Sequence, residues 1–302
     1  MRAAVAALAC ALLALAAAPG CGGETEPEVY GLIWQDEFDG PAGQLPDPAK
    51  WQFDVGTDWG NLQLEYDTNR AENCSLDGQG NLAITAREEE WQGQPYTSAR
   101  IKTMGLFARA YGRFEARIKL PVGQGIWPAF WMLGNDFPGV SWPGCGEIDI
   151  MEYRGQEPRV LVGSVHGPGY SGNGALTRTH TLAQGGFHLD YHIFAIDWEP
   201  ESITWSVDGY VYHRITPADL PAGTRWVFDH PFFILLNVAE GGRWVGSPDA
   251  STVSKTKGPP PRREPLSSSR PPQRPARLRS PGAGRSGSPT RCPSPGPRDT
   301  PG

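Results

Sequence analysis

Short apolar runs and turn-rich polar segments alternate along the chain, and no apolar pattern of helical period exceeds two turns. The alternation is clearest in Gly112–Leu120 (GRFEARIKL). Phe114 and Ala116 fall on one face and Arg113 and Glu115 on the other, because successive side chains of a strand point in opposite directions. This pattern predicts a strand in a sheet with one buried face and one wet face.

Four further segments predict strands. Ile126–Leu133 (IWPAFWML) and Pro231–Val238 (PFFILLNV) are apolar throughout, which is typical of strands buried on both faces. Asn81–Arg87 (NLAITAR) alternates, and an Asp-Gly pair at 208–209 separates two β-rich runs within 202–215, which predicts a two-residue hairpin. Together these segments predict an all-β fold, an antiparallel β-sandwich with Greek-key or jelly-roll connections.

Three carboxylates interrupt the apolar run Gly146–Tyr153 (GEIDIMEY). Glu147 and Asp149 are two residues apart and share a strand face, whereas Glu152 stands at an odd offset and would point away from them. One extra residue accommodated as a β-bulge, most simply near Met151, would return Glu152 to the same face. The segment then predicts a general acid, a nucleophile and an electrostatic partner.

Two plainer interpretations of these carboxylates stay open on the motif alone: a solvated strand edge, and a set of Ca²⁺ ligands. Calcium loops are acidic and contain glycine, whereas here Trp127, Trp131 and Trp142 lie within 20 residues upstream of Glu147. Aromatic faces beside paired carboxylates favour a sugar ring as ligand. Of the two tryptophans four residues apart, we expect one to pack into the core.

The net charge of −6 conceals two different parts of the chain. Residues 1–254 carry 16 Lys and Arg against 31 Asp and Glu, whereas residues 255–302 carry 11 against 2. Residues 255–302 also contain 13 Pro and no aromatic residue, Val or Ile, so residues 254–302 are predicted to be a disordered tail that supplies no strand. We interpret this tail as a shifted-frame ending or an unusual linker. Because no aromatic residue interleaves its arginines, nucleic-acid binding is not expected.

The N-terminus has the pattern of an export signal. Met1-Arg2, an Ala/Leu run and a small-residue zone ending at Gly20 predict a signal peptide over residues 1–20, too short and Ala-rich for a membrane span. The sequence APGC that follows resembles a bacterial lipobox, with Ala18 where Leu is usual. That resemblance implies acylation of Cys21, a tether over residues 21–29, and a protein held at the bacterial outer surface or in the periplasm. Plain secretion is the alternative.

Two of the five cysteines, Cys74 and Cys145, lie in the predicted domain, residues 30–253. In an exported protein they could pair as a disulfide, and they could equally be two separate buried thiols. Two isolated cysteines do not make a zinc site.

Six segments, in order along the chain, carry a family resemblance: DEFDG at 36–40, WGNLQLEY at 59–66, YTSARIKT at 96–103, YGRFEARIKLPVGQGIWPAFWML at 111–133, GEIDIME at 146–152 and LLNVAEGGRWVGSPDA at 235–250. Together they resemble family 16 of the glycoside hydrolases, and above all its bacterial laminarinase-like endo-β-1,3-glucanases. The resemblance implies a jelly roll of two curved sheets whose concave face binds the glycan.

The resemblance also implies a mechanism. Glu147 would be the nucleophile, Glu152 the general acid/base and Asp149 the group that tunes the nucleophile, in hydrolysis of internal β-1,3 bonds of laminarin-type glucans with retention. The ExDxxE spacing is similar to the bulged branch of the family. The implied substrate-binding residues are Trp127 and Trp131 as sugar platforms, Trp142 at the rim, and Asn61, Arg100 and His166 as partners of sugar hydroxyls.

The chain departs from the family pattern at two places. Glu240 stands where a small apolar residue is usual, and the family's closing strand is absent after residue 253. Some members bind a structural Ca²⁺ through the position of Glu37 and an Asp on that strand, so we expect the calcium site to be incomplete. The reaction requires no cofactor, and we expect a monomer.

Other functions remain to be weighed. One is hydrolysis of another β-linked polysaccharide: agarose, carrageenan or mixed-linkage glucan. Another is a jelly roll that binds carbohydrate without catalysis, but such a module gains nothing from three crowded carboxylates.

Overall fold

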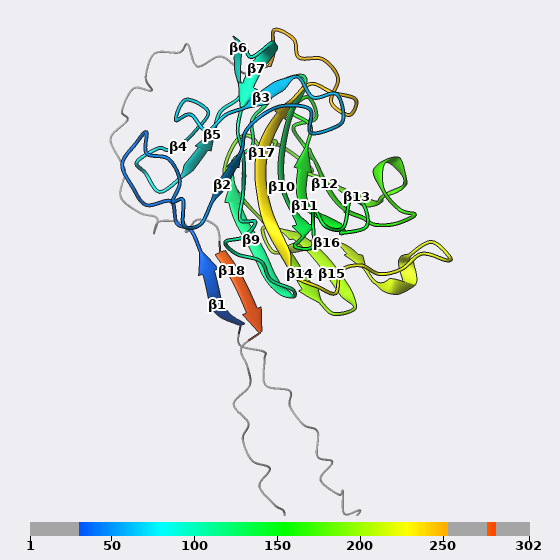
Figure 1. The fold of residues 1–302 in the computed structure, drawn as a ribbon. Helices are drawn as coiled ribbons and strands as arrows, with labels where there is room; N and C mark the ends of the chain where they lie inside the picture. Colours follow the sequence, from blue (N-terminus) through cyan, green and yellow to red (C-terminus); the bar gives the residue numbers. More distant parts are fainter. Residues whose placement is uncertain (1–29, 253–276, 282–302) are drawn as a thin grey trace, which may run out of the picture.

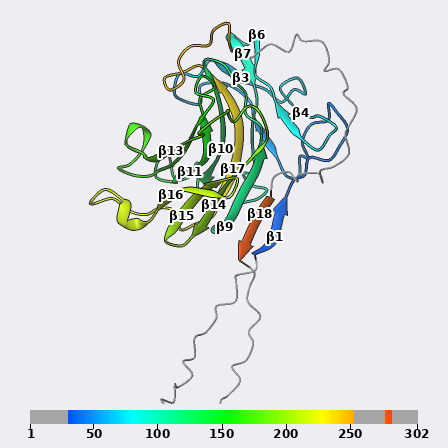
Figure 2. The same ribbon diagram turned by 180° about the vertical axis from the view of Figure 1, so that it is seen from behind.

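The structure, a computed structural model, describes residues 30–252 and 277–281. Two large antiparallel sheets pack face to face, and Figures 1 and 2 show both to be curved. The predicted all-β sandwich is confirmed. Within these ranges the helices are two 3₁₀ turns, and neither is long or apolar enough to cross a membrane.

One large sheet has six strands in the order β1-β18-β9-β14-β15-β16. Their bounds are β1 Tyr30–Gln35, β9 Gly112–Ile118, β14 His192–Glu199, β15 Ser202–Val207, β16 Tyr210–Ile215 and β18 Arg277–Pro281. The other has seven strands in the order β13-β12-β11-β10-β17-β8-β2. Their bounds are β2 Gln52–Asp54, β8 Arg100–Lys102, β10 Ile126–Gly134, β11 Glu147–Tyr153, β12 Val160–His166, β13 Leu176–Thr181 and β17 Phe232–Glu240.

Two small sheets and the 3₁₀ turns complete the described chain. The bounds are β3 Glu65–Asp67, β6 Arg87–Trp91 and β7 Gln94–Ser98 in one sheet, β4 Cys74–Leu76 and β5 Leu82–Ile84 in the other, and η1 Gly172–Gly174 and η2 Pro217–Asp219. The predicted strand over 81–87 is therefore wrong in part, because β5 ends at Ile84 and β6 begins at Arg87.

The core lies between the two large sheets and follows from the strand pattern. In β9, Phe114 and Ala116 are buried, whereas Arg113 lies on the outer face and pairs with Asp197 of β14 at 2.8 Å. The predicted hairpin joins β15 to β16. Asp208 and Gly209 have φ of 50° and 82°, the left-handed pair that a tight hairpin turn requires.

The two cysteines of the described domain are not paired. Cys74 and Cys145 are both free thiols with no exposed surface. Of the two alternatives left open by the sequence, separate buried thiols are therefore the one observed. Burial raises the pKa of Cys74 to about 12 and that of Cys145 to about 11, which keeps both thiols in the protonated form at neutral pH.

The expectation that the tail supplies no strand is wrong for five of its residues. β18, Arg277–Pro281, lies between β1 and β9, side by side with β1 in both views (Figures 1 and 2). Its pairing with β9 covers Arg113 to Glu115. The rest of residues 253–302, like the signal peptide and Cys21, lies outside the described residues.

A cavity of about 430 Å³ lies between the two sheets. Core side chains line it, among them Trp34 of β1, Ala116 of β9, Phe130 of β10 and Met151 of β11. None of the three carboxylates of β11 lines this cavity, so the candidate chemistry lies on the other face of the seven-stranded sheet.

Candidate active site

The predicted bulge is present in β11. On the β10 side, Asp149 pairs with Trp131 and Met151 with Phe130, so Ile150 is the extra residue. On the β12 side, Asp149 pairs with Ser164 and Glu152 with Val162, which places two residues of β11 opposite one. Both bulge residues, Ile150 and Met151, are 1% exposed and belong to the core.

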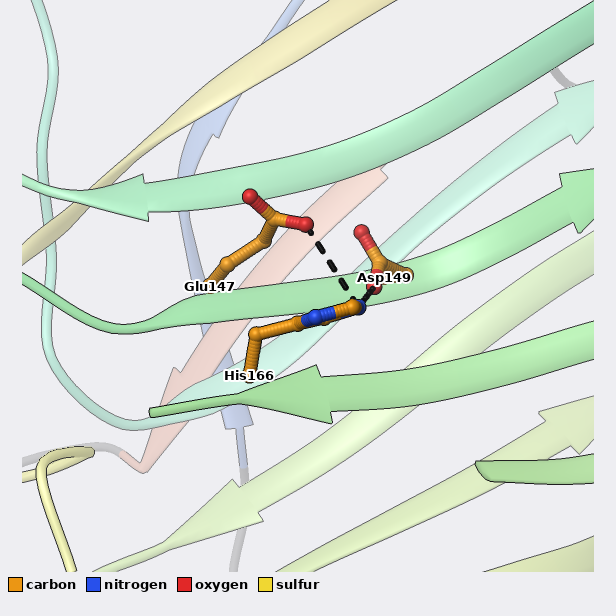
Figure 3. Close-up of side chains that lie close together, drawn as sticks. All are labelled: Glu147, Asp149 and His166. Carbon is orange, nitrogen blue, oxygen red and sulfur yellow. Dashed lines mark ion pairs between the residues drawn. The ribbon is translucent and has the colours of Figure 1, made fainter. Parts of the chain in front are cut away.

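Because both bulge residues point into the core, Glu147, Asp149 and Glu152 share the opposite face of the sheet. Glu147 and Asp149 have 16% and 4% of their side-chain surface exposed, and Figure 3 shows their carboxyl groups side by side. The sequence prediction that a bulge places these carboxylates on one face is confirmed. A solvated strand edge is excluded, since β11 is flanked by β10 and β12.

Burial raises the pKa of each of the three carboxyl groups to about 8. The charge of Asp149 raises the pKa of Glu147 and Glu152 further, whereas indole N–H groups lower them, from Trp142 toward Glu147 and from Trp127 toward Glu152. Three carboxylates so close together cannot all ionise at neutral pH. At neutral pH the three carboxyl groups therefore include both protonated and ionised members, and general acid–base catalysis requires both forms.

His166 of β12 lies beside the acidic pair. Its Nδ1 accepts a hydrogen bond from the backbone N–H of Gly172 at 3.0 Å, so in the neutral ring the proton sits on Nε2. Nε2 lies 3.1 Å from Asp149 Oδ2 and 3.6 Å from Glu147 Oε1 (Figure 3). The Asp149 contact is poorly directed, and Oδ2 has no hydrogen-bond partner among the described residues. A buried, unpaired oxygen favours a protonated Asp149.

The two tryptophans of β10 lie on the carboxylate face. Trp131 pairs across the sheet with Asp149, and Trp127, four residues away, has the same orientation. Both are half-buried, because an even spacing on a regular strand keeps both on one face. The expectation that one of them packs into the core holds only in part: the ring of Trp131 packs against a small buried cluster around Cys145. Trp127 donates its indole hydrogen to Glu152 Oε1 at 3.1 Å.

The remaining predicted binding residues lie around this centre. Trp142 is 44% exposed and its ring centroid is 6.0 Å from that of His166, which suits a rim position. Arg100 of β8 lies between the rings of Trp59 and Trp131, with its guanidinium carbon 5.0 Å and 4.9 Å from their centroids. Its charge is balanced by Asp54 at 3.0 Å.

Asn61 is exposed and lies on the loop between β2 and β3. Its backbone carbonyl accepts a hydrogen bond from the N–H of Arg243 at 2.8 Å, which ties this loop to the segment after β17. That segment carries Trp244, whose ring centroid lies 4.9 Å from that of Trp127. Sequence reasoning missed Trp244, although its position in the GGRW motif was the available signal.

A second group of buried carboxyl groups was also missed. Glu65, Asp67 and Glu240 are each at most 2% exposed, and the backbone N–H of Glu240 donates to Glu65 Oε2 at 2.8 Å. Burial raises the pKa of Glu65 to about 7 and of Glu240 to about 8. Glu240, noted in the sequence as a departure, therefore lies in the protein interior at the end of β17.

Two sets of residues bear on metal binding. Glu147, Asp149 and His166 each offer one ligand atom, and these three atoms lie within 4.8 Å of one another, close enough to bind one cation together. Glu37, the calcium ligand implied by the resemblance, is half-buried just after β1. The neighbouring β18, with the sequence RLRSP, contains no acidic residue to complete that site.

The chain is similar to known proteins along most of its length. The profile of the glycosyl hydrolases family 16 matches residues 58–257. The chain is similar to the beta-glucanase of Rhodothermus marinus, with 44% identity over 223 residues that cover 71% of this chain and 77% of the relative. Among solved structures, it is similar to the endo-beta-1,3-glucanase of Pyrococcus furiosus, with 43% identity, a TM-score of 0.69 and coverage of 83% and 91%. The laminarinase catalytic domain of Thermotoga maritima MSB8 has 42% identity, a TM-score of 0.71 and coverage of 83% and 98%.

Proposed function

This chain belongs to family 16 of the glycosyl hydrolases and hydrolyses β-1,3-glucans, and we propose that Glu147, Asp149 and Glu152 carry out the cleavage with retention of configuration. The observation that supports these roles is the bulge at Ile150, which puts all three carboxyl groups on one face. Retention requires two carboxyl groups about 5–5.5 Å apart, one to attack and one to donate a proton.

In the first step, Glu152 donates its proton to the glycosidic oxygen while Glu147 attacks the anomeric carbon. The bond to the leaving sugar breaks, and a covalent glycosyl–Glu147 ester forms. Trp127 keeps the carboxyl group of Glu152 oriented through its hydrogen bond. A protonated Asp149 donates to Glu147 and favours the ionised nucleophile in a site where burial opposes charge.

In the second step, Glu152, now ionised, removes a proton from water. The oxygen of that water attacks the anomeric carbon, and Glu147 leaves as a carboxylate. Two inversions at one carbon give net retention. The flanking tryptophans bind sugar rings next to the reacting bond, and Asn61, Arg100 and His166 bind sugar hydroxyls.

Glutamine substitutions test these roles. Glu147→Gln and Glu152→Gln should each abolish cleavage of laminarin while the fold is kept, and the double variant should be little worse than either single one, because the two groups act as a unit. Asp149→Asn should be milder. Glu199→Gln, at an exposed glutamate that ends β14 in the other sheet and accepts a hydrogen bond from Ser202 at 2.8 Å, is the matched control and should keep full activity. Near-wild-type turnover in either active-site glutamine variant would refute the assignment.

The substrate is tested by reducing-sugar release from laminarin, mixed-linkage glucan, agarose and carrageenan. We expect internal cleavage of laminarin, with long products appearing before glucose. Faster cleavage of agarose or carrageenan would assign the enzyme to galactans instead. Because the mechanism needs two carboxyl groups and no metal, we expect EDTA to leave the rate unchanged.

We also propose that the protein is exported and anchored through Cys21, on the basis of the signal-like residues 1–20 and the APGC sequence. Labelled palmitate should be incorporated by a bacterial host into the wild-type protein and not into Cys21→Ala. Equal labelling of both, or labelling of neither, would contradict the anchor.

A further inference from the structure

The bulge that aligns the carboxylates also interrupts the strand ladder beneath them. Ile150 and Met151 of β11 face the single residue Gly163 of β12, since the pairs on either side are Asp149 with Ser164 and Glu152 with Val162. A bulge leaves backbone groups without regular partners and bends the strand. The offset between Asp149 and Glu152 is therefore set by whatever holds the bulge in place.

A side chain from the opposite sheet contacts the strand at this point. Trp205 of β15, which has no exposed surface, donates its indole hydrogen to the backbone carbonyl of Asp149 at 2.8 Å. This hydrogen bond crosses the core from the six-stranded sheet to the catalytic strand of the seven-stranded sheet. It ends at the residue where the bulge begins.

The surroundings are shaped to admit this indole. A Cβ atom on Gly163 would lie 2.7 Å from Trp205 Cδ1 and 2.9 Å from its Nε1, closer than packing allows, so the absence of a side chain there makes room for the ring. The ring of Trp205 also stacks on His213 of β16, with centroids 4.8 Å apart and planes 29° apart. These contacts and the hydrogen bond to Asp149 fix the position of the indole.

We propose that Trp205 is a positioning residue for catalysis: its indole N–H fixes the backbone of the bulge and thereby the placement of Glu152 relative to Glu147 and Asp149. The inference rests on the proposed roles of those three carboxyl groups. Trp205 lies on the far side of β11 from the carboxylates and touches no substrate. Its ring contributes to core packing, whereas its N–H is the part that bears on the reaction.

Trp205→Phe removes the indole N–H but keeps an aromatic side chain in the core. Trp198→Phe is its matched control. Trp198 is also buried in the six-stranded sheet, but its indole donates to the carbonyl of Phe228 at 3.2 Å rather than to β11. Both variants replace a bicyclic indole by a smaller phenyl ring and lose one buried hydrogen bond, so both should lose thermal stability. Rates are measured on laminarin at a temperature where both are folded.

We expect Trp205→Phe to lower kcat by about 10- to 100-fold with KM within about twofold, because a small misplacement of a catalytic group lowers the rate without removing binding contacts. Trp198→Phe should keep kcat within about twofold. On a dinitrophenyl laminaribioside, whose leaving group needs little protonation, the loss in Trp205→Phe should shrink if Glu152 is the displaced group.

Equal kcat in the two variants, or a change confined to KM, would overturn the inference. If Trp205→Phe does not fold, 3-benzothienylalanine at position 205 keeps the bicyclic shape and replaces the N–H by sulfur; the same loss of kcat is then expected, and a wild-type rate would overturn the proposal. Failure of the proposed function is distinguishable, because Glu147→Gln and Glu152→Gln would then stay active whatever substitution stands at position 205.

Discussion

Trp127 and Trp131 point to the same side of β10 but donate their indole hydrogens to different groups: Trp127 to the carboxyl group of Glu152 at 3.1 Å, and Trp131 to the amide oxygen of Asn237 at 2.8 Å. The two tryptophans are therefore a natural matched pair. Replacing either by Phe keeps an aromatic surface for a sugar, but only one of the two changes alters the environment of a catalytic acid.

The first prediction concerns the alkaline limb of the pH profile. Glu152 must be protonated to act as the acid, so kcat/KM falls as pH rises through its pKa. The N–H of Trp127 stabilises the ionised form and lowers that pKa against the larger effect of burial. Trp127→Phe should therefore move the alkaline limb of kcat/KM upward by roughly one pH unit. Trp131→Phe should leave it in place. A downward shift, or equal shifts in both variants, would contradict the acid role of Glu152.

The second prediction concerns the acid limb. Glu147 must be ionised to attack, so activity rises as pH increases through its pKa. Burial raises that pKa, whereas His166 lowers it. His166→Ala should therefore shift the acid limb of kcat/KM to higher pH. His192→Ala, which removes a histidine paired with Asp208 at 2.7 Å, should not. An acid limb that moves to lower pH in His166→Ala would be inconsistent with Glu147 as nucleophile.

The third prediction concerns stability and pH at Glu240. This residue is fully buried, and neither of its carboxylate oxygens has a hydrogen-bond partner within the described chain. Burial, reinforced by Glu65, raises its pKa to about 8, above the value of about 4.3 in an unfolded chain. The folded state therefore binds the proton more tightly, and stability falls as pH rises from about 4 through about 8.

Replacing Glu240 by an apolar residue should remove this pH dependence. Glu240→Met should raise the Tm by roughly 3–10 °C more at pH 9 than at pH 5. Glu201→Met, exposed in the turn between β14 and β15, should change the Tm equally at both pH values. Thermal unfolding followed by circular dichroism makes the comparison. A Tm gain for Glu240→Met that is larger at pH 5 would mean that the carboxyl group is not held protonated.

The strand pattern and the odd spacing of Glu152 were enough to predict the sandwich and the bulge, because alternation with period two is a local property of the sequence. The exact position of the bulge was not predictable: Ile150 and Met151 are both apolar and both fit the core. The same limit applies to Asn81–Arg87, where the alternation continues through a break between two strands.

Contacts between distant segments could not be predicted from local pattern. The hydrogen bond from Trp205 to Asp149 joins residues 56 positions apart in different sheets. The backbone N–H of Glu240 donates to the carboxyl group of Glu65, which is 175 positions away. β18 was missed because Arg277–Pro281 has none of the β-branched or aromatic residues by which strands are recognised; backbone pairing with β1 and β9 does not require them.

The central claim is that Glu147 forms a bond to the sugar, and trapping that bond tests it most directly. A 2-deoxy-2-fluoro β-laminaribiosyl fluoride slows both steps but leaves a reactive fluoride, so the glycosyl-enzyme of the wild-type protein should accumulate. Peptide mass spectrometry after digestion should find the added disaccharide mass on Glu147. A label on Asp149 or Glu152, or no label together with an α anomer as the first product of laminarin cleavage, would contradict the account.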